Sequence, residues 1–138
     1  MFPPDTRILV IDDMPSIRDL VKNTLRAIGY KNIQEAGDGE DGLAAILKAH
    51  SAGMAFQLVI SDWNMPNCTG LELLKKVRAD SGLKTLPFLL LTAETEVSQV
   101  KQAVMAGVDN YVLKPFTTES LQVKIEQVHA RRIAAKPA

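Results

Sequence analysis

The chain is organised around the residues LVISDWNMPNCTG, Leu58 to Gly70, which also indicate where its functional site lies. Its first four residues, Leu58 to Ser61, have the apolar character of a buried strand, and the carboxylate of Asp62 follows them directly. Pro66 and Gly70 then require the backbone to turn into a loop. Asp62 is therefore expected at the carboxyl end of a strand, where open α/β sheets bind their ligands.

The composition is that of an ordinary globular protein. A chain of 138 residues with 46% hydrophobic and 23% charged residues can form one domain with a core, which excludes disordered and collagen-like classes. Basic and acidic residues number 16 each, so nucleic acid is not an expected partner. The sequence has no membrane-spanning run, and the start MFPPDTR lacks a secretory signal, so we expect a cytoplasmic protein that does not contact a membrane.

Apolar runs and helical periodicities alternate along the chain. The predicted strands are Arg7 to Ile11, Asn32 to Ala36, Leu58 to Ser61, Pro87 to Leu91 and Asp109 to Leu113. The apolar faces of the predicted helices carry Ile17, Leu20, Val21, Leu25 and Ile28, then Leu43, Ile46 and Leu47, then Leu71, Leu74 and Val77, then Val97, Val100 and Val104, and finally Leu121, Ile125 and Val128. This alternation predicts a doubly wound α/β fold, in which helices cover both faces of a parallel five-stranded sheet.

Local signals predict where several helices begin and end. Pro15 suits the first turn of a helix, and Thr69 with Glu72 forms the T-x-x-E pattern of a capping box. Glycines are predicted to end three helices, at Gly29, Gly82 and Gly107. The segment Ala49 to Gln57 is predicted to be a frayed helix end followed by a surface loop.

Polar residues follow the ends of four predicted strands and are expected to meet at one edge of the sheet. They are Asp12, Asp13, Asp62, Thr92 and Lys114. Two carboxylates about 4 Å apart repel by roughly 4 kcal/mol at an effective dielectric near ~20, so three of them require positive charge nearby. Lys114 supplies one positive charge, and Mg²⁺, which prefers oxygen ligands, would offset the remainder.

This arrangement suits phosphoryl transfer to a carboxylate, with Asp62 as the nucleophile. Each residue taken alone also fits a structural role: the acidic pair fits a turn, Thr92 a helix start, and Lys114 a solvated charge.

An Mg²⁺-dependent phosphatase or phosphotransferase for small molecules is the enzymatic alternative. The sequence has neither a GxxxxGK loop nor a second aspartate two residues past Asp62, where Asn64 stands, and both absences weigh against that alternative.

Four motifs resemble the receiver domains of response regulators, and most closely the stand-alone chemotaxis regulators. They are VIDD at Val10 to Asp13, SDWNMPN at Ser61 to Asn67, LTAE at Leu91 to Glu94 and YVLKPF at Tyr111 to Phe116. The resemblance runs from about Thr6 to His129 and implies one receiver domain over residues 1–138, with 130–138 as a short basic tail. It also implies the flavodoxin-like (βα)5 fold with strand order 2-1-3-4-5.

The resemblance implies roles for the residues of the predicted site. Asp62 would accept a phosphoryl group from a histidine kinase, and Lys114, preceding a cis peptide bond to Pro115, would pair with that group. Asp13, Asp62 and the carbonyl of Asn64 would hold Mg²⁺, with Asp12 acting through water.

The resemblance further implies a switch that follows phosphorylation. Thr92 would move toward the phosphoryl group and Tyr111 would turn inward, reshaping a face that binds a downstream protein. Asn64 and Glu94 would flank the attacking water and make the phosphoryl group short-lived.

The implied function is that of a monomeric phosphoacceptor switch, not an enzyme on other substrates. Its partners would be the kinase and one output protein, with the flagellar motor switch as a candidate. A phosphorelay carrier that passes the group to another histidine is the alternative within the same family. At Glu96 and Val97 the chain lacks the lysine pair of the motor-binding regulator.

Overall fold

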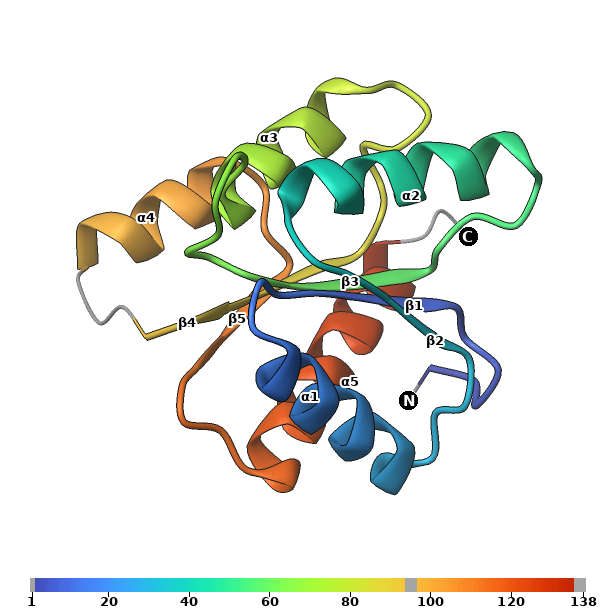
Figure 1. Cartoon of the computed structure of the whole chain (residues 1–138), viewed down its shortest axis with the longest axis vertical. Helices are drawn as coiled ribbons and strands as arrows, with labels where there is room; N and C mark the ends of the chain where they lie inside the picture. The colour runs from blue at the N-terminus through green and yellow to red at the C-terminus, as the bar shows by residue number, and fades with distance from the viewer. Residues whose placement is uncertain (1, 94–96, 136–138) are drawn as a thin grey trace.

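The computed structural model describes residues 2–93 and 97–135 and has the predicted three-layer α/β architecture (Figure 1). Strands and helices alternate throughout the described residues. The elements are β1 Ile8–Ile11, α1 Pro15–Ile28, β2 Ile33–Ala36, α2 Gly39–Ser51, β3 Leu58–Asp62, α3 Gly70–Ala79, β4 Phe88–Thr92, α4 Val97–Met105, β5 Asn110–Leu113 and α5 Thr118–Ala135. No helix within these ranges is both long and apolar enough to cross a membrane.

The five strands form one parallel sheet in the order β2-β1-β3-β4-β5, which confirms the order implied by the resemblance. The register pairs Ile11 with Ser61, Asp62 with Leu91, and Thr92 with Leu113. The carboxyl ends of β1, β3, β4 and β5 therefore lie side by side. The residues that follow or end these strands are brought to one edge.

Helices α1 and α5 cover one face of the sheet, and α2, α3 and α4 cover the other (Figure 1). Successive strand residues alternate between the two hydrophobic cores, because neighbouring side chains on a strand point to opposite faces. In β1, Leu9 and Ile11 belong to the core under α2 and α3, while Ile8 and Val10 belong to the core under α1 and α5. Both faces of the central strands are buried, as their continuous apolar sequences predict.

Several predicted boundaries need correction. Helix α2 continues through Ser51, so Ala49 to Ser51 are regular helix and not a frayed end, while the predicted loop follows from 52 to 57. Helix α3 ends at Ala79 and not at Gly82, because Asp80 is extended and its Oδ1 accepts the Gly82 N–H at 2.8 Å. Helix α5 continues to Ala135, so the residues from 130 to 135, predicted as a tail, are helical.

The predicted apolar faces are largely correct but include three exposed residues. Leu20 is 50% exposed, Leu47 is 42% exposed and Val104 is 60% exposed. Among the side chains of α4 that the structure describes, the one buried against the sheet is that of Ala103, next to Val104. Periodicity identifies the face of a helix that turns inward, but not which residues at its margin the neighbouring elements cover.

Candidate functional site

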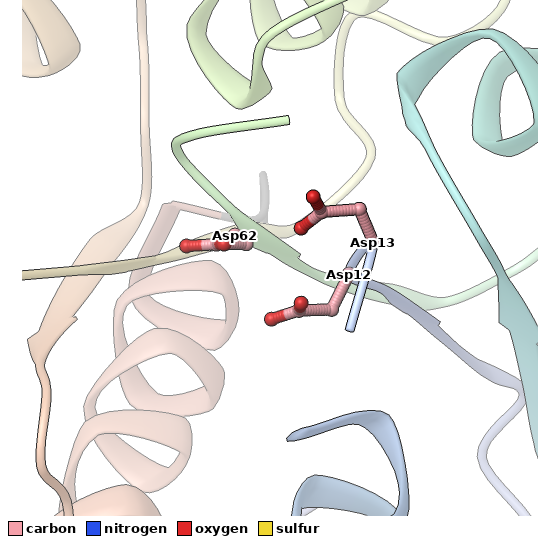
Figure 2. Close-up of side chains that lie close together, drawn as sticks. All are labelled: Asp12, Asp13 and Asp62. Carbon is pink, nitrogen blue, oxygen red and sulfur yellow. The ribbon is translucent and has the colours of Figure 1, made fainter. Parts of the chain in front are cut away.

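The acidic residues predicted to meet at the edge of the sheet do so. Figure 2 shows Asp12 and Asp13, which follow β1, beside Asp62 at the end of β3. Each offers a carboxylate oxygen, and these oxygens all lie within 4.8 Å of one another. Asp12 and Asp62 are buried, at 1% and 8% exposure, whereas Asp13 is exposed. The cluster is therefore open to solvent on the Asp13 side.

Asp12 is held at several of its atoms. Its Oδ1 accepts the Met14 N–H at 2.9 Å, and its main-chain N–H donates to the Ala36 carbonyl of β2 at 3.3 Å. Its main-chain carbonyl accepts Arg18 Nη1 at 2.6 Å. The turn from β1 into α1 is consequently fixed by contacts to β2 and to α1.

Asp62 is fixed by the turn that follows β3. Its Oδ1 accepts the Trp63 N–H at 2.8 Å, and Trp63 also pairs through its main chain with Leu91 of β4. Helix α3 begins close behind it: a Cβ on Gly70 would lie 2.2 Å from the Asp62 carbonyl oxygen. Gly70 is thus required for the approach of α3, which starts at the predicted Thr69–Glu72 capping box.

Lys114 joins the cluster from β5, as predicted. Its Nζ lies 3.0 Å from Asp62 Oδ1 and 3.4 Å from Asp12 Oδ2. The Lys114 main-chain N–H donates to the Thr92 carbonyl at 2.8 Å, which ties the end of β5 to that of β4. The Lys114–Pro115 peptide bond is cis, which confirms that expectation.

One lysine does not neutralise the site. Burial raises the pKa of Asp62, and the negative charge of Asp12 raises it further, while hydrogen bonding and charge attraction from Lys114 oppose the shift. The raised pKa means that the folded protein resists ionisation of this carboxyl. When all three carboxylates are ionised, their negative charge exceeds the single positive charge of Lys114.

This shift predicts a pH-dependent cost to stability. Because the pKa of Asp62 is raised above 3.8 in the folded protein, its contribution to stability is greatest below pH about 4 and is lost as the pH rises through the raised pKa. We therefore expect Asp62→Asn to increase the free energy of unfolding of the metal-free protein at pH 7 by about 1 kcal/mol. Urea denaturation with a chelator, at pH 7 and below pH 4, measures this difference. A variant less stable than the wild type at pH 7 would contradict it.

The cluster fits a magnesium ion. The three carboxylates supply the oxygen ligands that Mg²⁺ prefers, and Asp13 faces solvent, which leaves room for retained waters. Mg²⁺ binds oxygens at about 2 Å, so two ligands on one ion lie at most about 4 Å apart, and the 4.8 Å cluster needs only a small contraction.

The predicted switch residues lie on the two strands that follow β3 in the sheet, with Thr92 at the carboxyl end of β4 and Tyr111 within β5. Thr92 ends β4 and is 2% exposed. Tyr111 of β5 is half-buried; it packs against the core under α2 and α3, and Lys124 Nζ of α5 lies 5.4 Å from its ring centroid.

Of the two residues predicted to tune dephosphorylation, the structure describes only Asn64. Asn64 is exposed in the loop after β3. That the Asn64 carbonyl binds Mg²⁺ stays a prediction, as does the position of Asn64 beside the attacking water. Glu94 and Glu96 lie outside the described residues.

Sequence reasoning missed two groups of polar residues. Arg18, which binds the Asp12 carbonyl, gave no signal beyond one charge on the polar side of an amphipathic helix. Asp109, predicted only to begin a strand, has a side chain 5% exposed and forms ion pairs with Arg78 and Arg132 at the opposite edge of the sheet. Neither group has a sequence motif, because each joins residues distant in the chain.

Fold and site together define a doubly wound α/β protein with an acidic, oxygen-rich site at the carboxyl edge of its sheet. The chain belongs to the response regulator receiver domain family, which it matches over residues 8–126.

Among its relatives, the chain is 45% identical to chemotaxis protein CheY of Pseudomonas aeruginosa over 125 residues, which are 91% of this chain and 97% of that protein. It is 43% identical to chemotaxis protein CheY-3 of Vibrio cholerae over 125 residues, 91% and 92% of the two chains. Its structure is similar to that of the chemotaxis response regulator CheY4 of V. cholerae, with a TM-score of 0.79, 37% identity and coverage of 90% of this chain and 98% of the other.

Proposed function

We propose that this receiver domain is a phosphoacceptor switch in which Asp62 takes a phosphoryl group from the phosphohistidine of a kinase. The observation that carries this proposal is the meeting of three carboxylates, with Lys114 Nζ 3.0 Å from Asp62. Asp13, Asp62 and the carbonyl of Asn64 are the proposed holders of Mg²⁺, and Asp12 is proposed to act on the ion through water. The bound ion supplies positive charge for the phosphoryl oxygens.

In the transfer step, a carboxylate oxygen of Asp62 attacks the phosphorus atom of the phosphohistidine. A phosphorus–oxygen bond forms, the phosphorus–nitrogen bond breaks, and its electron pair stays on the histidine nitrogen. Lys114 stabilises the negative charge on the transferring group, because its ammonium already lies beside the acceptor. The protein contributes position and charge, and no second nucleophile is required.

Phosphorylation adds a charge of roughly −1.5 to −2 at the carboxyl ends of β3 and β4. The Thr92 hydroxyl and Lys114 are proposed to move toward that charge, and Tyr111 to follow Thr92 inward. Tyr111 lies between the α4 side of the sheet and Lys124 of α5, so its movement would change the surface formed by α4, β5 and α5. A downstream protein would bind this surface.

The relatives named as chemotaxis proteins support a role in chemotaxis, and we propose that the domain, with its core from about 6 to 129, acts there as a cytoplasmic monomer. The flagellar motor switch is the first candidate for its output partner. Its enzymatic activity is confined to assisting its own phosphorylation and dephosphorylation, in which Asn64 and Glu94 are proposed to take part.

The test uses Trp63, the only tryptophan, which follows Asp62 and is 8% exposed. We expect its fluorescence to change when Mg²⁺ binds and to change again when a small acyl phosphate donates its phosphoryl group. Both changes should be absent in Asp62→Asn. An unchanged signal in the wild type, together with no Mg²⁺ affinity by calorimetry, would overturn the proposed function.

A further inference from the structure

Arg18 of α1 connects three elements at the acidic edge of the sheet. Its Nη1 donates to the main-chain carbonyl of Asp12 at 2.6 Å, and its Nε lies 3.4 Å from Glu35 Oε1 on β2. The Arg18 side chain is only 16% exposed, although it belongs to the polar side of its helix. The planar guanidinium uses separate nitrogens for the two contacts, which holds its orientation.

The carbonyl that Arg18 binds belongs to the peptide group joining Asp12 to Asp13. Within residues 2–93 and 97–135, no group donates a hydrogen bond to the Asp13 carboxylate or forms an ion pair with it. Asp12, in contrast, is held through its own carboxylate by the Met14 N–H and by Lys114. The position of the Asp13 carboxylate therefore depends on the orientation of the main chain that precedes it.

We infer that Arg18 is a positioning residue for Asp13: it orients the Asp12–Asp13 peptide so that the exposed carboxylate faces Asp62 for Mg²⁺. This inference rests on the proposed function. Residues that orient the ligands of a metal ion change its affinity about 10- to 100-fold when they are replaced. Arg18 acts on the main chain, so its removal leaves all three carboxylates in place and loosens one of them.

The positive charge of Arg18 makes an opposite contribution, because a cation near the site disfavours a second cation. Glu35 offsets that charge through its ion pair with Arg18, and Lys22 also pairs with Glu35. Positioning and charge repulsion therefore predict opposite changes in Mg²⁺ affinity when Arg18 is replaced. Loss of positioning weakens Mg²⁺ binding, whereas loss of repulsion strengthens it.

The experiment measures Mg²⁺ affinity by calorimetry and by Trp63 fluorescence for the wild type, Arg18→Met and Arg18→Lys. Arg18→Met removes both the charge and the donors, and Arg18→Lys keeps the charge but cannot reach the Asp12 carbonyl and Glu35 with separate nitrogens. Arg26→Met is the matched control, because Arg26 is exposed on the same helix and donates to Asn23. We expect the dissociation constant to rise about tenfold in both Arg18 variants and to stay unchanged in Arg26→Met.

A second readout separates positioning from general damage. At saturating Mg²⁺ the Arg18 variants should accept a phosphoryl group at close to the wild-type rate, because the acceptor and Lys114 are intact. Unchanged or tighter Mg²⁺ binding in Arg18→Met would overturn the inference, as would wild-type affinity in Arg18→Lys or an acceptance defect that saturating Mg²⁺ does not restore. A wild type that binds Mg²⁺ and accepts the phosphoryl group supports the proposed function whichever result the variants give.

Discussion

Asp62→Asn is expected to abolish phosphoryl acceptance, reducing its rate by at least about a thousandfold, or ~4 kcal/mol of transition-state free energy. The amide keeps an oxygen that can accept the Trp63 N–H, so the turn after β3 has no reason to change. It lacks the negative charge and the nucleophilic oxygen of the carboxylate, and it no longer pairs with Lys114 as an ion. Mass spectrometry of protein treated with phosphorylated kinase, or with an acyl phosphate, counts the phosphoryl groups acquired.

The matched control for this prediction is Asp80→Asn, an exposed aspartate directly after α3. It should be phosphorylated like the wild type. Phosphorylation of Asp62→Asn to the wild-type extent would place the acceptor elsewhere. Together with the expected gain in metal-free stability, the variant should lose function while becoming harder to unfold.

Asp109→Ala is expected to lower the free energy of unfolding by about 3–5 kcal/mol and the Tm by roughly 10–20 °C. The Asp109 carboxylate lies 3.0 Å from Arg78 Nη2 and 2.7 Å from Arg132 Nε, and its Oδ2 accepts the Phe88 N–H at 2.7 Å. Its side chain is 5% exposed and that of Arg78 is 15% exposed. Removing the carboxylate leaves a largely buried guanidinium without its ionic partner and a strand N–H without its acceptor.

This second prediction has its own control in Asp19→Ala. Asp19 is 67% exposed and pairs with Lys22 at 3.4 Å, so its loss should cost under about 1 kcal/mol. Urea denaturation measures both variants. Because Asp109 lies at the opposite edge of the sheet from Asp62, folded Asp109→Ala should keep its Mg²⁺ response. A loss of stability no larger than that of Asp19→Ala would show that the network contributes little.

The two edges of the sheet therefore have opposite electrostatic character. At the amino end of β5 one carboxylate meets two arginines, and its interactions join α3, β4, β5 and α5. At the carboxyl edge three carboxylates lie together and Lys114 pairs with two of them, Asp12 and Asp62, which favours binding of a cation at a cost to the stability of the free protein. A site whose charge balance depends on a bound cation is suited to a switch, because a change of charge there changes the local structure.

Much of the site could be predicted because its residues stand at strand ends. The runs before Asp12, Asp62 and Thr92 are almost wholly apolar, and such runs are typical of strands buried on both faces. In a parallel sheet their carboxyl ends share an edge, so position in the sequence translates directly into proximity. The capping box at Thr69 and Glu72 was predictable for the same reason, since all its contacts are local.

Other features could not be predicted from periodicity. Leu20 and Val104 fit the apolar spacing of their helices but are 50% and 60% exposed, because the elements that the structure describes cover these side chains only in part. The contacts of Arg18 with Asp12 and of Asp109 with Arg132 depend on distances between separate elements. A charged residue on a helix has the same local pattern whether it meets water or another element.

The alternation of strands and helices, the strand ends at which the acids and the lysine stand, and the chemistry of those groups all follow from local composition and from spacing along the chain. Which charges compensate one another depends on the packing of distant elements, since Coulomb and hydrogen-bond energies vary with separation and burial. Lys114 shared between two acids, Arg18 on the Asp12 carbonyl and Asp109 between two arginines are the consequences.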